Sequence, residues 1–374
     1  MDAAPPDLAL PARRDALAEA AERSAGFDVL EEERIWATAE ELRGECLEPD
    51  RYPRCSEAEY GHPQARVVPF DPTAKIRWQR GLDLVSRCPV WVPSVMACYG
   101  LTDNVPAEKF SHQVSTGYAL HTDPVVAALR GLCEVIERDA VSVVWLQRLP
   151  VPALDPALLG GNAAEMVEAL RERFPRVHLF DATSDVGVPT VYSLFGAEHD
   201  TTARIGVAAG CGLTLAQAAE QAVHEAMSVH GVAHWDADEA MPGSLAETQG
   251  LGDTTRYLAQ PHHASAFDFL LAGAGDLRPP RRAPLPRDPG EALDVIVDRL
   301  AGAGMRPVVV DRTPRELRGV GLTAISAVVP DLQPMGVDPL AQFKGHRRLY
   351  EAPRRMGYRS VPEAELNPLP QPFS

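Results

Sequence analysis

The sequence predicts an α/β (α+β) fold in which sheets are flanked by helices. Three observations predict it. Runs of β-branched and aromatic residues, bounded by turn formers, recur along the chain. Alanine-rich segments with apolar residues at a 3.6-residue period lie between these runs. The chain has 374 residues, 45% of them hydrophobic and 24% charged, and can therefore bury a substantial core.

The first sixty residues predict a small helical cap or extension over residues 1–62, with helices at 11–24 and 33–46. From residue 65, β-branched and aromatic residues mix with turn formers, which predicts strands in ARVVPF, KIRWQRG and PVWVPSVMACYG. A long helix is expected next. Thr122 or Asp123 can cap it, and Pro124 suits its first turn.

The second half repeats this order of strand, glycine-containing turn and alanine-rich helix bearing a glutamate. We expect a helix over about 215–232, a loop-rich insertion over about 233–290, and a helix over 290–303. Strands are predicted in RVHLFDAT, VPTVYSLF, RIGVAAGCG, RPVVVD and LTAISAVVP.

Composition excludes several classes of protein. A net charge of -16 argues against a general nucleic-acid binder, because phosphates repel an acidic surface. The six cysteines form no CxxC pair and no cluster with zinc spacing. The start resembles no signal peptide, and no apolar stretch is long enough to span a bilayer. These features predict a reduced, cytoplasmic protein without nucleic-acid or membrane partners.

The stretch GLCEVIERDA places two carboxylates inside an apolar run. On a helix, Glu134 and Glu137 share a face, and Arg138 lies one turn beyond Glu134. Gln221 and Glu225 share a face of the second helix in the same way. Carboxylate oxygens suit Mg²⁺, and a guanidinium suits phosphate oxygens.

A less specific interpretation stays open at this point. An ExxER pattern is often a solvated helix face with an internal salt bridge. His224 and His230 have no partner at metal-ligand spacing. There is no GxxxxGK[ST] loop, no GxGxxG after a strand and no GxSxG elbow, so ATP would need a different architecture.

The order of several motifs resembles the YcaO family. STGYALHTDPVVAALRGLCEVIERDA is similar to its first motif, Ser-x3-Glu-x2-Glu on a helix after a glycine-containing turn, and QAVHE is similar to its second. VVPDLQPM, GHRRLYEAPRRMGY and the terminal PLPQPFS are similar to later stretches. The resemblance implies a YcaO catalytic domain over 63–374, with an ATP cleft between the helices at about 124–139 and 213–232.

The resemblance implies roles for individual residues. Glu134, Glu137 and Glu225 match the glutamates that hold Mg²⁺ ions on ATP phosphates. Arg138 and Gln221 match nucleotide-binding or site-organising positions, and Ser115 lies in the turn that could approach phosphate. Two departures are notable. Arg130 stands where the motif has serine, and its cation could meet phosphate or point away, which makes it a further candidate nucleotide contact. Ser228, Val229 and His230 replace the usual continuation of the second motif.

The family uses ATP to activate a peptide backbone amide. A nucleophile adds to the amide carbon, ATP phosphorylates the resulting oxyanion, and phosphate then carries the oxygen away. RRLYEAP and the terminal PxPxP are most similar to cyclodehydratases, which form thiazoline or oxazoline from Cys, Ser or Thr of a ribosomally made precursor peptide. Amidine macrocycles and thioamides are the alternatives within the family.

The PxPxP segment consists of Pro368, Pro370 and Pro372. Alternating prolines favour an extended chain that could hold the carboxylate of Ser374 in the active site, where it could orient the substrate or take its proton. The alternative is a disordered tail. The resemblance thus implies a catalytic role for these four residues.

The resemblance indicates partner proteins less directly than it indicates the fold and the site. Many such systems bind the substrate's leader through a winged-helix module, and residues 1–62 are too short and too helical for one. This points to a separate leader-binding partner or to recognition by another surface, and a homodimer is compatible with the family. Two further classes stay open: a non-catalytic peptide-binding scaffold, and an accessory protein of a sulfur-transfer pathway.

Overall fold

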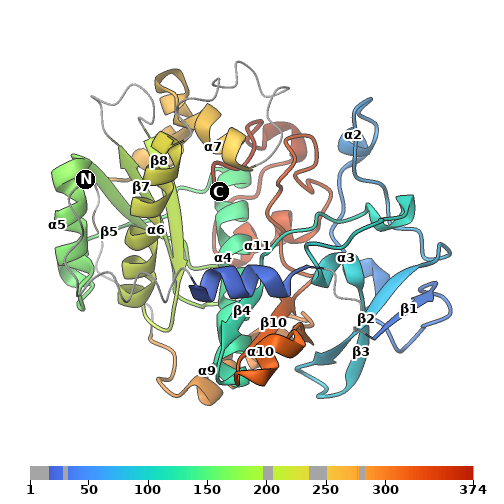
Figure 1. Cartoon of the computed structure of the whole chain (residues 1–374). Helices are drawn as coiled ribbons and strands as arrows, with labels where there is room; N and C mark the ends of the chain where they lie inside the picture. Colours follow the sequence, from blue (N-terminus) through green and yellow to red (C-terminus); the bar gives the residue numbers. More distant parts are fainter. Residues whose placement is uncertain are drawn as a thin grey trace. The chain divides into compact units, whose positions relative to one another are not determined.

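The computed structural model describes residues 17–27, 33–196, 205–235, 251–275, 277 and 283–373, without the side chains of residues 173, 227–235 and 251. The chain forms two units, which can be followed by residue number in Figure 1. One unit contains Met1–Tyr52, Phe70–Val135 and Pro289–Pro330, and the other contains Pro53–Pro69, Ile136–Asp288 and Asp331–Ser374. Each unit therefore combines three segments that are not contiguous in the sequence. The predicted boundary near residue 62 stays a prediction.

The first unit contains an antiparallel sheet. Its described strands lie in the order β1-β2-β9-β10-β4, with β3 also paired to β2. The strands are β1 (Arg34–Ala37), β2 (Ile76–Asp83), β3 (Pro89–Pro93), β4 (Tyr118–His121), β9 (Val308–Asp311) and β10 (Thr323–Val328). The helices are a segment over residues 17–25, η1 (Pro49–Arg51), α3 (Ser94–Ala97), η2 (Pro106–Glu108), α9 (Pro289–Gly302) and α10 (Arg315–Gly319).

The core of the first unit is built around Trp78 of β2, which is fully buried. Its indole Nε1 donates a hydrogen bond of 2.9 Å to the Ala37 carbonyl and so fixes β1 beside β2. Tyr52 packs on Phe110 with ring centroids 5.6 Å apart, and Phe70 meets both rings edge-on. Aromatic burial thus holds the outer segments to the sheet.

The second unit contains an antiparallel sheet in the order β5-β6-β7-β8. The strands are β5 (Ala153–Leu154), β6 (Arg176–Asp181), β7 (Thr190–Gly196) and β8 (Ile205–Cys211). The helices are α2 (Glu57–Tyr60), η3 (Pro156–Leu158), α5 (Ala163–Arg173), α6 (Leu215–Trp235), α7 (Leu251–Ala259), η6 (Pro261–Phe267), α8 (Asp268–Leu271), α11 (Arg348–Arg355) and η7 (Glu363–Glu365). Helix α4 (Pro124–Gln147) belongs to both units, since the boundary in the sequence falls between Val135 and Ile136.

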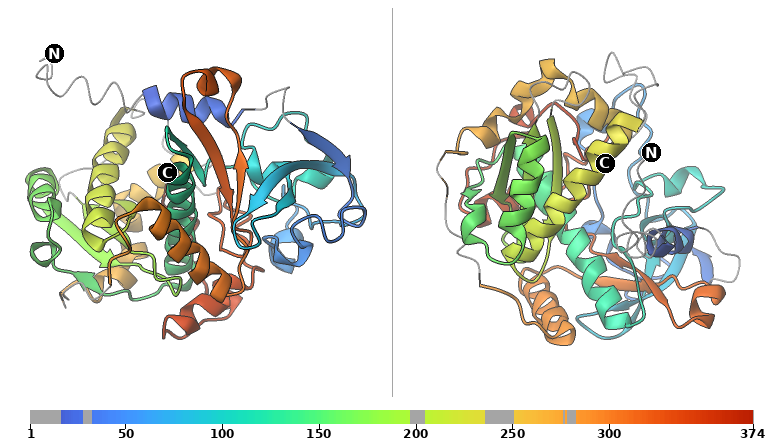
Figure 2. Two further views of the ribbon diagram at one scale, coloured as in Figure 1. Left: turned by 90° about the horizontal axis from the view of Figure 1, so that it is seen from below. Right: turned by 60° about the vertical axis from the view of Figure 1, so that its left-hand side comes forward.

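Both faces of the second sheet are covered, because every residue of β7 is buried. Val191 and Phe195 face the core formed with α5 and α6, which lie together on that side (Figure 2). Tyr192 and Leu194 point to the opposite core, where the end of α4 packs. Gly210 allows the close approach of α6, since a Cβ there would lie 2.1 Å from the Ala218 carbonyl oxygen.

The predicted long helices and most strands are confirmed, but two predictions are wrong. Residues 33–46 were expected to be helical, yet Arg34–Ala37 form β1 and turns follow. Residues 65–70 were expected to form a strand, and they belong to no helix or strand. The expected loop-rich insertion contains α7, η6 and α8 among its described residues.

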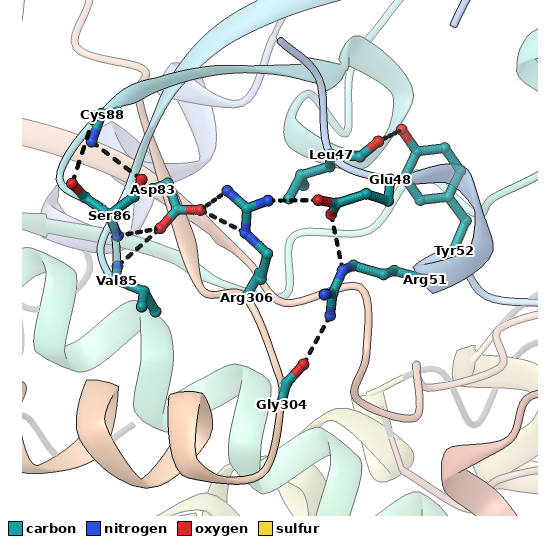
Figure 3. Close-up of polar contacts among 10 residues, drawn as sticks. All are labelled: Leu47, Glu48, Arg51, Tyr52, Asp83, Val85, Ser86, Cys88, Gly304 and Arg306. Atoms are coloured by element: carbon teal, nitrogen blue, oxygen red, sulfur yellow. Dashed lines mark hydrogen bonds and ion pairs between the residues drawn. The ribbon is translucent and has the colours of Figure 1, made fainter. Parts of the chain in front are cut away.

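A polar network in the first unit joins the β2–β3 turn to the segment before β9 (Figure 3). The Asp83 carboxylate accepts hydrogen bonds from the Val85 and Ser86 N–H groups at 2.8 and 2.9 Å and from Arg306 Nε at 2.7 Å. Arg306 Nη1 also pairs with Glu48 at 2.7 Å. Burial alone would raise the pKa of Asp83, but the Ser86 N–H and the Arg306 guanidinium outweigh it and lower the pKa.

Replacing Asp83 by asparagine should lower the free energy of unfolding by roughly 2–3 kcal/mol, because it leaves the Arg306 charge without its most buried partner. Urea unfolding at pH 7 measures the loss. The wild-type contribution is present above the unfolded pKa of an aspartate and is lost as the pH falls through the lowered folded value. Asp294→Asn is the control, since that carboxylate is 73% exposed and lies 3.9 Å from Arg87. Equal stability of both variants would refute the structural role of Asp83.

Candidate functional site

Helix α4 carries the acidic motif. The Asp123 carboxylate caps its start by accepting a hydrogen bond of 2.8 Å from the Val125 N–H. Glu134 and Glu137 lie on successive turns, and Glu134 is half-buried while Glu137 is only 7% exposed. The alternative of a solvated helix face is therefore wrong for Glu137. The Glu137 carboxylate is therefore largely shielded from bulk water.

The glycine-containing turn before β4 lies against α4 in the first unit. The Gly117 N–H donates a hydrogen bond of 2.9 Å to the Glu134 carboxylate. Gly117 has a φ of 91°, which favours glycine, and a Cβ on Gly131 of α4 would lie 2.5 Å from the Gly117 carbonyl oxygen. The two glycines thus allow the backbone to hold Glu134. Ser115, the predicted phosphate contact, is half-buried just before this turn.

A second carboxylate lies near the same segment. Glu22, in the helix over residues 17–25, accepts a hydrogen bond of 3.2 Å from the Leu120 N–H. Burial and then the negative charge of Glu134 raise the pKa of Glu22 to about 7. Sequence reasoning missed Glu22. No spacing signal could reveal it, because the contact joins residues 98 positions apart.

The middle of α4 is anchored within the second unit. Asp139 is fully buried and pairs with Arg348 Nη2 at 2.7 Å, and the same nitrogen lies 2.7 Å from Asp185. Arg138 Nη1 lies 3.1 Å from Met335 Sδ. Arg348 is the first residue of α11, so its ion pair with Asp139, the residue after Arg138, ties α11 to α4.

Near this anchor, His346 is buried and its Nε2 lies 3.3 Å from the Asp331 carbonyl oxygen. Burial lowers the pKa of His346 to about 4; the Asp331 carbonyl opposes this shift and Arg348 adds to it. The unfolded chain takes up a proton at an ordinary histidine pKa, so the folded state should lose about 2–4 kcal/mol as the pH falls from about 6.5 to 4. Urea midpoints at pH 7 and pH 5 test this. The pH-dependent loss should be smaller in His346→Gln, and an equal loss would contradict the assignment.

Three further predicted residues are exposed. Arg130 lies on α4, and Gln221 and Glu225 lie one turn apart on α6, whose other face is buried through Ala222 and Val223. Their exposure leaves them accessible to a ligand.

The segment after α11 caps the end of α4. The Asn367 N–H donates to the Leu146 carbonyl at 2.8 Å, and its side-chain Nδ2 donates to the Trp145 carbonyl at 3.3 Å. Trp145 Nε1 in turn donates to the Leu369 carbonyl at 3.0 Å. The last carbonyls of a helix have no partner within the helix, so this distant segment satisfies them.

The proline motif is packed within the second unit. Pro370 and Pro372 are buried, while Pro368 is exposed. Thr255 Oγ1 donates a hydrogen bond of 3.0 Å to the Pro372 carbonyl. The alternative of a disordered tail is therefore wrong up to residue 373, and Ser374 lies outside the described residues.

Carboxylate oxygens dominate the donor set that the sequence predicts. Within the described ranges, no group of three or more His, Cys, Asp and Glu side chains is arranged to hold a metal ion. Mg²⁺ keeps several waters and is commonly bound by one or two carboxylates together with substrate phosphates. Glu134, held by the Gly117 N–H, and the buried Glu137 place two carboxylates on one helix face, a donor set that is compatible with this mode of Mg²⁺ binding.

Comparison with known proteins identifies the family of this chain. A family model described as YcaO cyclodehydratase, ATP- and Mg²⁺-binding, matches residues 9–333. The chain therefore belongs to the YcaO family. An uncharacterized protein in the tfuA 3′ region of Rhizobium leguminosarum bv. trifolii is 27% identical over 320 residues, which cover 79% of this chain and 68% of that protein.

Solved structures share the fold. The heterocyclase TruD superposes with a TM-score of 0.73 at 24% identity, covering 97% of this chain and 50% of TruD. This chain thus spans half the length of TruD. YcaO from Methanopyrus kandleri, solved with AMPPCP and Mg²⁺, superposes with a TM-score of 0.60 at 20% identity over 85% of this chain and 75% of that one. The E. coli microcin synthetase McbBCD complex gives 0.61 at 15% identity over 87% and 80%. No helix among the described residues is long and apolar enough to cross a membrane.

Proposed function

We propose that this chain uses ATP and Mg²⁺ to activate a backbone amide of a ribosomally made precursor peptide and closes a Cys, Ser or Thr side chain onto it. The product is a thiazoline or oxazoline. The observation that carries the proposal is the pair Glu134 and Glu137 on one face of α4, with Glu134 held by the Gly117 N–H and Glu137 buried. Family membership and the heterocyclase neighbours support the same reaction class.

In this proposal Glu134, Glu137 and Glu225 hold Mg²⁺, which neutralises phosphate charge when it is bound. Arg138 contributes a permanent positive charge for phosphate oxygens. Gln221, Ser115 and Arg130 complete the candidate nucleotide contacts. A neighbour solved with AMPPCP and Mg²⁺ supports this cofactor pair.

The reaction replaces a poor leaving group by a good one. The substrate's thiol or hydroxyl adds to the amide carbon, and the resulting oxyanion takes the γ-phosphoryl group of ATP. Loss of phosphate with that oxygen, together with the amide proton, forms the C=N bond and leaves ADP. The chain contributes charge neutralisation at Arg138 and substrate positioning at Pro368, Pro370, Pro372 and Ser374, where the last residue is the candidate proton acceptor.

The proposal includes partner proteins. In it, the leader of the precursor peptide binds a separate protein or another surface of this chain. A neighbour solved as the McbBCD complex, and another with pro-MccB17 bound, support a peptide substrate and a multi-protein assembly.

The test is the intact mass of a precursor peptide after incubation with this chain, Mg²⁺, ATP and any co-encoded leader-binding protein. We expect ATP-dependent loss of one or more waters. Blocking the peptide's thiols, and then its amine, separates azoline from amidine. Replacement of oxygen by sulfur when sulfide is added would instead show thioamide formation. An unchanged mass in all reactions would favour a non-catalytic scaffold or accessory role.

A further inference from the structure

Gln371, between Pro370 and Pro372, connects the proline segment to the helix that carries the acidic motif. Its side chain is fully buried, and its Nε2 donates a hydrogen bond of 2.7 Å to Ser142 Oγ. The Ser142 hydroxyl, also fully buried, donates a hydrogen bond of 2.6 Å to the Arg138 carbonyl. A continuous chain of hydrogen bonds thus runs from Gln371 to the backbone of Arg138.

The hydrogen bonds fix the orientation of the Gln371 amide. A serine hydroxyl has one proton, and Ser142 uses it on the Arg138 carbonyl, so Ser142 must accept from the amide nitrogen of Gln371. The Gln371 Oε1 atom is then a buried acceptor without a hydrogen-bond partner among the described residues. Such an unmet acceptor destabilises the folded protein. Stability alone therefore does not explain a glutamine here.

The prolines on either side of Gln371 allow its hydrogen bond to hold the whole segment in place. Each proline restricts its own φ, so a hydrogen bond between two prolines fixes the segment on both sides. The Pro372 carbonyl is held separately by Thr255 at 3.0 Å. We propose that Gln371 is a positioning residue, which sets the place of the proline segment along α4 relative to Arg138 through Ser142. This inference rests on the proposed function and assigns the step that aligns the tail with the reacting amide.

The variants are Gln371→Met, which keeps the length and apolar stem of the side chain, and Ser142→Ala, which removes the bridging hydroxyl. We expect kcat for peptide dehydration to fall about 10–100-fold in each, since a small misplacement of a positioning group has effects of this size. KM for ATP should stay within about twofold. Gln371→Met should melt no lower than the wild type, because it removes a buried acceptor without a partner.

Thr190→Val is the matched control. Thr190 is fully buried and donates a hydrogen bond of 3.1 Å to the Val188 carbonyl, in a part of the second unit that belongs to neither the proline segment nor α4. It should leave kcat of the folded protein unchanged. Unchanged kcat in Gln371→Met and Ser142→Ala, with an active wild type, would overturn the inference.

A second readout does not depend on activity. Hydrogen exchange of the Leu369, Gln371 and Phe373 amides should become faster in both variants, while exchange in α6 stays the same. Unchanged exchange at these amides would overturn the positioning role. If the wild type modifies no peptide but exchange accelerates, the proposed function fails and the structural link between Gln371 and α4 stands.

Discussion

Replacing Glu134 by glutamine should weaken Mg²⁺-dependent ATP binding by about 100-fold or more and abolish peptide dehydration. The loss of one anionic ligand accounts for the effect, since Mg²⁺ prefers charged oxygen donors. Glutamine keeps an oxygen that can accept the hydrogen bond from the Gly117 N–H, so the turn should stay in place. The change also removes a negative charge beside Glu22, so the variant should be no less stable. Nucleotide titration with and without Mg²⁺ measures the effect.

Glu168→Gln is the control for this experiment. Glu168 is 68% exposed and pairs with Arg171 on the surface of α5, so it should bind ATP like the wild type. Glu137→Gln should behave like Glu134→Gln if both carboxylates face the same ion. Wild-type ATP affinity in both site variants would remove α4 from the proposed site.

Deleting Pro372–Ser374 should lower peptide dehydration about 1000-fold or more while changing ATP affinity less than about threefold. The deletion removes the Pro372 carbonyl that Thr255 holds, and with it the proposed catalytic end of the segment. It also removes Phe373, which is 5% exposed and packs edge-on against Tyr192 with ring centroids 5.0 Å apart. Removing a buried phenylalanine costs roughly 3–5 kcal/mol, so part of any loss could come from unfolding.

Phe373→Ala separates the two causes, because it creates a similar cavity and keeps the backbone of the segment. Both variants are compared by melting temperature, by ATP affinity and by the mass of the product peptide, at a temperature where both are folded. We expect the deletion to be inactive and Phe373→Ala to retain activity. Full activity of the deletion would eliminate the catalytic role of the segment.

Local pattern predicted the elements that carry the glutamates. The apolar period around Ile136 and Val223 predicts α4 and α6, and both helices are confirmed. Helix α6 buries one face, whereas residues 139–147 of α4 are buried on all sides. The same reasoning fails at residues 33–46. There, Ile35 and Trp36 pair with β2, and Thr38 and Glu41 exchange hydrogen bonds across a short turn, so tertiary pairing overrides helix propensity.

The site itself was only partly accessible to sequence reasoning. Glu134 and Glu137 share a face through helix geometry alone, so their spacing predicts them. The contacts of Glu22 with Leu120 and of Gln371 with Ser142 join residues 98 and 229 positions apart, and no local period encodes such contacts. Burial of Glu137 is likewise set by packing, since an ExxER pattern is compatible with either a solvated or a covered face.

The capping of α4 by Asn367 has a consequence for synthesis on the ribosome. The Trp145 carbonyl accepts from the nearby Arg148 N–H, but its second donor, the Asn367 side-chain amide, is made 222 residues after it. At about 5–20 residues per second, the nascent chain carries the end of α4 without the Asn367 contacts for roughly 10–45 seconds. During that interval, Trp145 and its apolar neighbours lack the packing that the C-terminal residues of the same core later provide. Stalled or truncated nascent chains should therefore expose this end of the helix to chaperones and proteases, even though the helix itself was completed long before.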